Sequence, residues 1–195
     1  MFIVFEGLDG SGTSTQLTLI GGWLGCYTTS EPSNSSVGKF IRESLKTGEL
    51  SPTTMALLFA ADRKEHLEKE IEPRLARGEL VLCDRYTMSS LAYQTAAGVD
   101  PEYVEFINKD FRKPDITFYF DVDVETASIR RKERGAEDCY ENTLFQSKVR
   151  KEYHHQLLQN PYEHVQLIHA VQSVEEVTKQ LKKILGRLNK FKDIK

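Results

Sequence analysis

The stretch that decides the fold is GLDGSGTST, residues 7–15. It follows the apolar run FIVF at residues 2–5, whose continuous hydrophobicity and β-forming residues are typical of a strand buried on both faces. Beyond the stretch, apolar residues recur at three- and four-residue spacing, at Leu17, Ile20 and Leu24, which predicts a helix. The chain is therefore predicted to begin with a strand, a glycine-rich loop and a helix.

The glycine-rich loop differs by one residue from the phosphate-binding pattern G-x-x-x-x-G-K-[ST]. Gly7, Gly12 and Ser14 match the pattern, and Thr13 stands where the pattern has lysine. The backbone N–H groups of such a loop bind phosphate together with the helix N-terminus, and this binding needs the glycines rather than the lysine. The Ser14 hydroxyl occupies the position that holds Mg²⁺ in these loops. We therefore expect phosphate binding without the lysine's positive charge.

The rest of the chain alternates strand-like and helical patterns. Four further runs are typical of strands: CYTTSEP (26–32), ELVLCDRY (79–86), DITFYFDVD (115–123) and HVQLIHA (164–170). Helical patterns separate them, which predicts an α/β fold of three layers, α/β/α, around a parallel sheet of roughly five strands. No repeat or interdomain linker is visible, so residues 1–195 are predicted to form a single domain.

Composition and charge bear on the partners, the cysteine chemistry and the location of the protein. Acidic residues outnumber basic ones by 29 to 26, which gives no electrostatic reason to expect nucleic acid or an anionic membrane as a partner. The three cysteines lie far apart, against a zinc site or a disulfide framework. The N-terminal sequence has neither a basic region nor a long apolar segment. We expect a cytoplasmic protein without a membrane span.

A second group of candidate residues lies at the end of the LVLC strand. Asp84 and Arg85 follow this strand directly, and ligands bind at the carboxyl edge of open α/β sheets. Asp84 is a candidate for holding Mg²⁺ through water or for orienting the metal-bound nucleotide, and Arg85 is a candidate for gripping a second phosphate with two hydrogen bonds. The alternative reading is an ion pair on the protein surface.

The third group is the arginine cluster RRKERG, residues 130–135. Arg130 and Arg134 lie on one face of a predicted helix, next to Arg131. The polar stretch that follows is suited to a mobile lid, which we place at about residues 130–142. Arginines on a closing lid would supply the charge that Thr13 lacks, as arginine fingers do in other phosphoryl-transfer enzymes. A solvated charged face is the alternative interpretation.

These motifs together resemble a known family. The matching pieces keep their order over nearly three-quarters of the chain: FEGLDGSGTST, TTSEP, LLFAADR, LVLCDRY, SSLAYQ, PDITFYFDVDVETASIRRKERG and YENTLFQ. The chain resembles the thymidylate kinases, nucleoside monophosphate kinases that transfer a phosphoryl group from ATP to dTMP. The resemblance implies a P-loop NTPase fold with a small lid, ATP as co-substrate, Mg²⁺ as cofactor and a homodimer packed through helices.

The resemblance also implies residue roles. ATP would be bound by Gly7, Leu8, Asp9, Gly10, Ser11, Gly12, Thr13, Ser14 and Thr15, with Ser14 and Asp84 on the metal. Phe59 would stack on the thymine ring, and Arg63 would reach its exocyclic oxygen. Ser89, Ser90, Tyr93, Gln94 and Tyr140 would surround the base and sugar, with Tyr93 placed to exclude a ribose 2′-hydroxyl. The catalytic group would be Asp9, Arg85, Arg130, Arg131 and Arg134, with Arg85 holding the dTMP phosphate and Asp9 near that phosphate, the sugar hydroxyl or the metal.

The sequence departs from the family pattern at two positions. Thr13 replaces the lysine, and Ser30 stands where many members have arginine before Glu-Pro. Leu8 and Ser11 add no charge to the loop, so the lid arginines are expected to carry more of the electrostatic work. Two alternatives stay open: a kinase for another nucleoside monophosphate or a deoxynucleoside, and a nucleotide-binding protein with impaired catalysis, which Thr13 alone supports.

Overall fold

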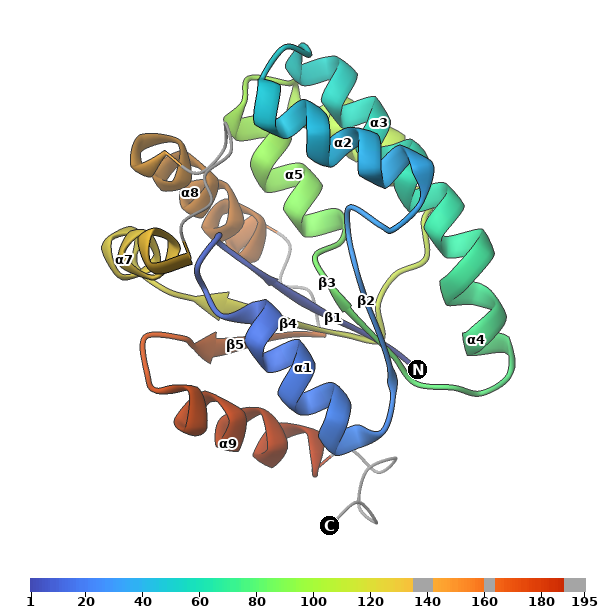
Figure 1. Ribbon diagram of the computed structural model, residues 1–195, viewed down its shortest axis with the longest axis vertical. Helices are drawn as coiled ribbons and strands as arrows, with labels where there is room; N and C mark the ends of the chain where they lie inside the picture. Colours follow the sequence, from blue (N-terminus) through green and yellow to red (C-terminus); the bar gives the residue numbers. More distant parts are fainter. Residues whose placement is uncertain (135–141, 160–163, 188–195) are drawn as a thin grey trace.

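The computed structural model describes residues 1–134, 142–159 and 164–187. The elements follow in chain order (Figure 1): β1 (Phe2–Gly7), α1 (Thr13–Leu24), β2 (Tyr27–Ser30), α2 (Ser36–Thr47), α3 (Pro52–His66), η1 (Leu67–Ile71), α4 (Glu72–Ala76), β3 (Val81–Asp84), α5 (Thr87–Ala96), α6 (Pro101–Asn108), β4 (Ile116–Asp121), α7 (Val124–Arg134), α8 (Thr143–Gln159), β5 (Val165–His169) and α9 (Val174–Leu185). Here η1 is a π-helical turn.

The five strands form one parallel sheet in the order β2-β3-β1-β4-β5. Strand β1 is central, with Phe5 opposite Asp84 on β3 and opposite Phe118 on β4. Every residue of β1 is buried because helices cover both faces of the sheet. The predicted parallel sheet, and the interpretation of FIVF as a doubly buried strand, are confirmed.

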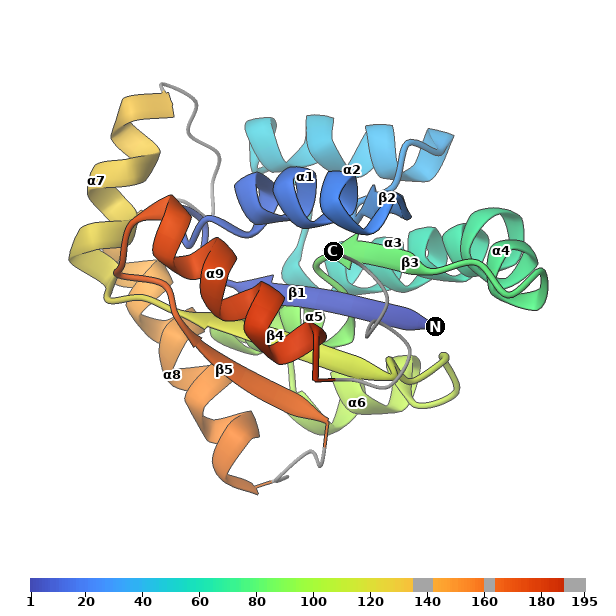
Figure 2. The same cartoon turned by 90° about the horizontal axis from the view of Figure 1, so that it is seen from below.

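Helices cover the sheet in two layers. Helices α1 and α9 pack together on one face, and α5 and α8 pack together on the other (Figures 1 and 2). Helix α3 contacts α5, and α2 packs against α3 farther from the sheet. This arrangement confirms the predicted α/β/α layering. Across the described ranges, no helix combines the length and apolarity needed to cross a membrane.

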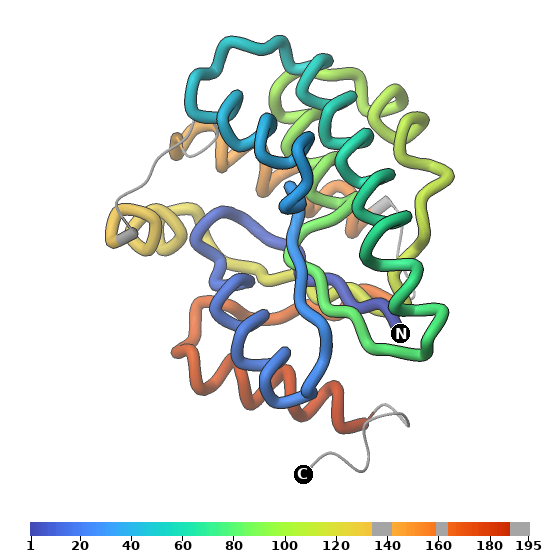
Figure 3. Tube along the Cα trace, turned by 45° about the vertical axis from the view of Figure 1, so that its right-hand side comes forward, coloured from blue at the N-terminus to red at the C-terminus, as the bar shows by residue number. Residues whose placement is uncertain are grey.

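The first β-strand and its neighbours end at the same edge of the sheet, which positions the candidate site. The β1–α1 loop, the β3–α5 turn and the start of α7 after β4 all lie there, because carboxyl ends of parallel strands share an edge. Helix α7 lies beside the β1–α1 loop (Figure 3), with the Arg131 guanidinium donating to the carbonyl of Asp9 at 2.7 Å.

Helix α3, which carries two candidate base-binding residues, has well-defined ends. Ser51 caps its N-terminus by accepting a hydrogen bond from the amide of Thr54, and Pro52 occupies the first turn. The π-helical turn η1 separates α3 from the short helix α4, in which Pro73 occupies the first turn. Proline lacks the backbone N–H that the hydrogen-bond pattern of an α-helix needs at each position. The break between α3 and α4 therefore lies where Pro73 interrupts that hydrogen-bond pattern.

Candidate active site

The glycine loop has the geometry that phosphate binding requires. Gly10 and Gly12 have φ of +87° and +92°, a backbone conformation that favours glycine. A Cβ on Gly10 would lie 2.4 Å from the carbonyl oxygen of Ala127, so helix α7 also excludes a side chain there. Gly12 caps α1 without a side-chain hydrogen bond, which leaves the helix N-terminus open to a ligand.

The two candidate metal ligands meet at the loop. The Ser14 hydroxyl donates to Oδ2 of Asp84 at 2.6 Å, although the residues are 70 positions apart. The other oxygen, Oδ1 of Asp84, is buried without a hydrogen-bond partner among the described residues. Magnesium prefers oxygen ligands such as a carboxylate and a hydroxyl. The residues present therefore fit Mg²⁺.

A cavity of about 510 Å³ adjoins the loop, and we call it the donor cavity. The loop residues Leu8 to Gln16 form one wall, and residues 170–177 of the β5–α9 region form another. Thr13, at the lysine position, is buried. The arginines that line this cavity, among the residues that the structure describes, are Arg85 and Arg130. The positive charge near the loop therefore comes from outside the loop itself.

The three arginines of the predicted lid segment have different surroundings. Arg130 lines the donor cavity, and its guanidinium donates to the main-chain carbonyls of Ala170 and Val171 at 2.8 and 3.3 Å. Arg131 is buried and holds the carbonyl of Asp9, with Nη2 lacking a partner among the described atoms. Arg134 ends α7, but its side chain lies outside the described part of the structure, as do residues 135–141, which include the candidate Tyr140.

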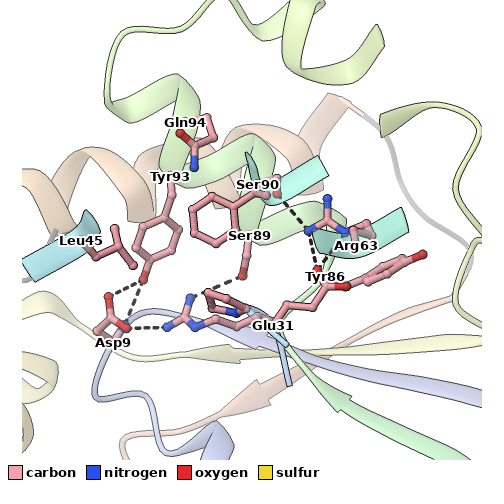
Figure 4. A pocket seen from close by; sticks show the side chains of 12 residues that line it. Asp9, Glu31, Leu45, Arg63, Tyr86, Ser89, Ser90, Tyr93 and Gln94 are labelled. Carbon is pink, nitrogen blue, oxygen red and sulfur yellow. Dashed lines mark hydrogen bonds and ion pairs between the residues drawn. The ribbon is translucent and has the colours of Figure 1, made fainter. Parts of the chain in front are cut away.

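A smaller cavity of about 130 Å³ lies on the other side of Asp9, and we call it the acceptor pocket (Figure 4). Its lining includes every candidate substrate-binding residue that the structure describes: Asp9, Phe59, Arg63, Arg85, Ser89, Ser90, Tyr93 and Gln94. The remaining lining residues, Glu31, Pro32, Leu45 and Tyr86, were missed by the sequence reasoning. Glu31 and Pro32 lay within the quoted TTSEP motif, which was the available signal.

Arg85 and Asp9 form one end of the acceptor pocket. Nη2 of Arg85 pairs with Oδ1 of Asp9 at 2.6 Å, and the Tyr93 hydroxyl donates to Oδ2 of Asp9 at 2.8 Å. Gln146 donates to the same Asp9 oxygen at 2.9 Å. Burial alone would lower the pKa of Arg85, but Asp9 and other acidic groups raise it well above its ordinary value, so the guanidinium stays charged. Both Arg85 and Asp9 also line the donor cavity, so this ion pair lies between the two cavities.

The backbone of Arg85 is strained in a way that the surrounding structure maintains. Its φ of +69° is in the left-handed region, which residues other than glycine rarely adopt. Beneath it, Oε1 of the fully buried Glu6 accepts hydrogen bonds from the amides of Tyr86 and Ser89 at 2.9 and 3.2 Å. The Tyr153 hydroxyl donates to Oε2 of Glu6 at 3.0 Å, and burial raises the pKa of Glu6. Glu6 therefore holds the turn that presents Arg85.

The opposite end of the acceptor pocket holds Arg63 and Ser90 (Figure 4). Arg63 pairs with Oε2 of Glu31 at 2.6 Å and donates to the Ser90 hydroxyl at 2.9 Å. Its side chain is almost fully buried, and the ring of Tyr86 lies 4.9 Å from the guanidinium carbon. Each end of the pocket therefore presents a guanidinium paired with a carboxylate, Arg63 with Glu31 at this end and Arg85 with Asp9 at the other.

The fold and the site define a P-loop α/β protein in which the glycine loop lines one cavity and a second cavity lies beyond Asp9. A family model described as "Thymidylate kinase" matches residues 5–181. The chain is 43% identical over 193 residues to a "Probable thymidylate kinase" of Pyrobaculum aerophilum, covering 98% of this chain and 99% of that protein. It is 46% identical over 183 residues to a "Probable thymidylate kinase" of Methanocaldococcus jannaschii, covering 93% of each. The chain therefore belongs to the thymidylate kinase family.

Proposed function

We propose that this protein phosphorylates dTMP to dTDP with ATP as the phosphate donor. The observation that carries the proposal is the position of the Arg85–Asp9 pair, which lines both the donor cavity and the acceptor pocket. A phosphoryl group that passes between two bound ligands must cross such a boundary, and a cation there stabilises the charge that both phosphates bring. Family membership supports dTMP as the acceptor.

Phosphoryl transfer needs positioning and charge stabilisation more than covalent chemistry by the protein. The loop amides from Gly7 to Thr15 bind the donor phosphates, and Arg85 places the acceptor phosphate for in-line attack. Asp9 orients Arg85 through their 2.6 Å ion pair. At the other end, Phe59 stacks on the base and Arg63 donates to a carbonyl of the base edge.

Two further features concern the sugar and the metal. Tyr93 lies against Asp9, where its ring limits the space beside the sugar and disfavours a ribose 2′-hydroxyl. Burial raises the pKa of Tyr93, so its hydroxyl stays a neutral donor. Ser14 and Asp84 are the residues that would hold Mg²⁺, which supplies charge neutralisation of the donor phosphates when bound.

The missing lysine is compensated, in this proposal, by arginines of the segment 130–142. Arg130 is supported best, because it lines the donor cavity from a helix that contacts the loop. Arg131 supports the loop from below through the carbonyl of Asp9. Closure of the segment would exclude water and add Arg134 to the site. An arginine in this role is worth about 10³–10⁵ in rate in other phosphoryl-transfer enzymes.

The proposal is tested by ADP release with ATP and Mg²⁺, measured with dTMP, dUMP, dCMP, dGMP, AMP or thymidine and without an acceptor. We expect release that depends on dTMP. If only a different acceptor stimulates ADP release, that acceptor is the substrate in place of dTMP. Binding of ATP with no stimulation by any acceptor would favour a nucleotide-binding protein with impaired catalysis, for which the buried Thr13 is the supporting observation.

A cytoplasmic location and a homodimer belong to the same proposal. Exposed apolar side chains on α2, α3 and α6, namely Phe40, Leu57 and Phe106, support a helical contact between two copies. The central residues of α5, by contrast, are buried within the chain. Light scattering coupled to size-exclusion chromatography measures the mass, and a monomer at working concentrations would contradict the dimer.

A further inference from the structure

We propose that Asn108, a residue outside the lining of the acceptor pocket, fixes the direction of the Arg63 guanidinium and thereby determines which base the pocket accepts. The inference rests on the proposed function, because it assigns Arg63 to the base of the acceptor nucleotide. Asn108 is the last residue of α6 and is 7% exposed. Its role is that of a positioning residue, since it acts on the substrate through Arg63.

The ion pair with Glu31 does not by itself prevent the Arg63 guanidinium from rotating in its own plane. Nε and Nη2 of Arg63 approach the same carboxylate oxygen, Oε2 of Glu31, at 2.8 and 2.6 Å. Two contacts that converge on one atom act as a pivot rather than as a two-point clamp. The Tyr86 ring, 4.9 Å from the guanidinium carbon, limits tilting out of the plane. Rotation within the plane, about Oε2, is opposed on the near side by the hydrogen bond from Nη2 to the Ser90 hydroxyl at 2.9 Å, and the far corner of the guanidinium remains to be restrained.

Asn108 supplies that restraint at the far corner of the guanidinium. Its side-chain oxygen accepts a hydrogen bond from Nη1 of Arg63, the nitrogen that makes no bond to Glu31. The amide cannot flip without loss, because Nδ2 of Asn108 donates to the carbonyl of Val104 at 2.8 Å, one turn earlier in α6. The acceptor atom is therefore aimed at Arg63 by the helix that carries it.

The count of donors shows what is left for a substrate. A guanidinium has five N–H groups and no acceptor. Glu31 takes those of Nε and one of Nη2, Ser90 takes the second of Nη2, and Asn108 takes one of Nη1. With the contacts of the described residues counted, one N–H of Nη1 remains. A donor in a fixed direction suits the carbonyl at position 4 of thymine or uracil and opposes the amino group of cytosine, which is itself a donor.

The experiment compares Asn108→Leu, Asn108→Asp and a matched control, Gln156→Leu. Leucine has a similar volume without an acceptor, whereas aspartate keeps the acceptor oxygen and loses the donor to Val104. Gln156 is also a buried amide that donates to a main-chain carbonyl, that of Met88, and none of its hydrogen bonds involves Arg63. Steady-state kinetics with dTMP, dUMP and dCMP, and calorimetric binding of dTMP and dCMP, are measured for each variant.

We expect Asn108→Leu to raise the KM for dTMP by about 10- to 100-fold, as loss of one hydrogen bond to a charged group does, with kcat within about twofold. Its preference for dTMP over dCMP should fall by about tenfold. Asn108→Asp should recover most of the wild-type KM and preference, and Gln156→Leu should match the wild type. Unchanged preference in Asn108→Leu, or equal losses in the leucine and aspartate variants, would overturn the proposal.

Two controls separate this inference from its premises. Circular dichroism shows whether each variant folds, and Asn108→Ala replaces the leucine variant if that one does not. If wild-type protein phosphorylates no acceptor, the proposed function fails, and calorimetry still reports whether Asn108 controls the choice between dTMP and dCMP. A wild type that binds neither nucleotide overturns the inference as well.

Discussion

The acceptor pocket and the donor cavity differ in how their positive charge is held. In the acceptor pocket, Arg63 and Arg85 are each paired with a carboxylate at 2.6 Å and are further fixed by buried polar groups. In the donor cavity, the loop geometry is in place but Thr13 brings no charge, and Arg130 is engaged with main-chain carbonyls. The comparison separates two tasks that a lysine-containing loop performs together: binding the phosphates and stabilising the charge that develops on them.

Replacing the cation shared by both cavities should have the largest effect. We expect Arg85→Ala to lower kcat/KM for dTMP by about 10⁴-fold, because it removes the group that aligns the phosphates and leaves Asp9 without its cationic partner. Steady-state kinetics measure the loss. Arg112→Ala is the control, since Arg112 forms an ion pair with Glu72 at the surface, where such pairs contribute little. A loss below tenfold would remove Arg85 from the proposed mechanism.

The next largest effect concerns the charge supplied to the donor cavity. We expect Arg130→Ala to lower kcat by about 10²–10³, less than a lone arginine finger because Arg131 and Arg134 share the task, with a small change in KM for dTMP. Arg131→Ala should also lower the free energy of unfolding, because its side chain is buried against the loop. Single-turnover and steady-state rates measure the loss of turnover in both variants, and urea unfolding measures the loss of stability in Arg131→Ala. Unchanged turnover in Arg130→Ala, Arg131→Ala and Arg134→Ala alike would contradict compensation.

Loop geometry can be disrupted without changing any charge. Gly10→Ala should lower the free energy of unfolding by about 2–4 kcal/mol and weaken ATP binding, since the left-handed φ and the 2.4 Å approach to Ala127 both oppose a Cβ. Gly22→Ala is the matched control within α1, where an added Cβ meets nothing within 4 Å. That control should be neutral or stabilising by up to about 1 kcal/mol. Urea unfolding and ATP titration measure both variants, and equal stabilities would contradict the close approach.

Restoring the lysine tests whether the two sources of charge are interchangeable. We expect Thr13→Lys to raise kcat in the Arg130→Ala background by about tenfold more than in the wild type, a coupling of about 1.4 kcal/mol. The measurement is a double-mutant cycle on kcat with saturating dTMP. Additive effects would show that lysine and Arg130 act on different steps, and the compensation hypothesis would then lose its support.

Local patterns were enough to predict the strand, loop and helix, because each depends on neighbouring residues only. The resemblance then brought together the pocket residues that the structure describes, from Asp9 to Gln94. The partners that hold these residues could not be predicted in this way. Asn108 contacts Arg63 across 45 positions, and Glu6 contacts Tyr153 across 147, so no local pattern records the pairing. A carboxylate at the end of an apolar strand was the one signal that Glu6 gave.

The smallest expected effect is the contribution of Glu6 to the pH dependence of stability. It tests directly how the buried Glu6 carboxyl supports the turn at Arg85. Burial raises the pKa of Glu6 above its ordinary value of 4.5, so the folded protein binds this proton at a higher pH than the unfolded chain does. Its contribution to stability is therefore complete below pH 4.5 and is lost as the pH rises through the raised pKa. The wild-type free energy of unfolding, relative to that of Glu6→Gln, should decrease over that range. Urea unfolding at a series of pH values measures the difference.

A buried substitution with no titrating group separates this effect from general acid sensitivity. Thr117→Val, on the neighbouring strand β4, should keep a constant difference from the wild type over the same pH range, since Thr117 is buried and uncharged. If Glu6→Gln also shows a constant difference, the carboxylate is as well solvated by its hydrogen bonds as by water. The four groups that donate to it would then offset the cost of its burial, and the carboxyl under the strained Arg85 turn would ionise over the same pH range as in the unfolded chain.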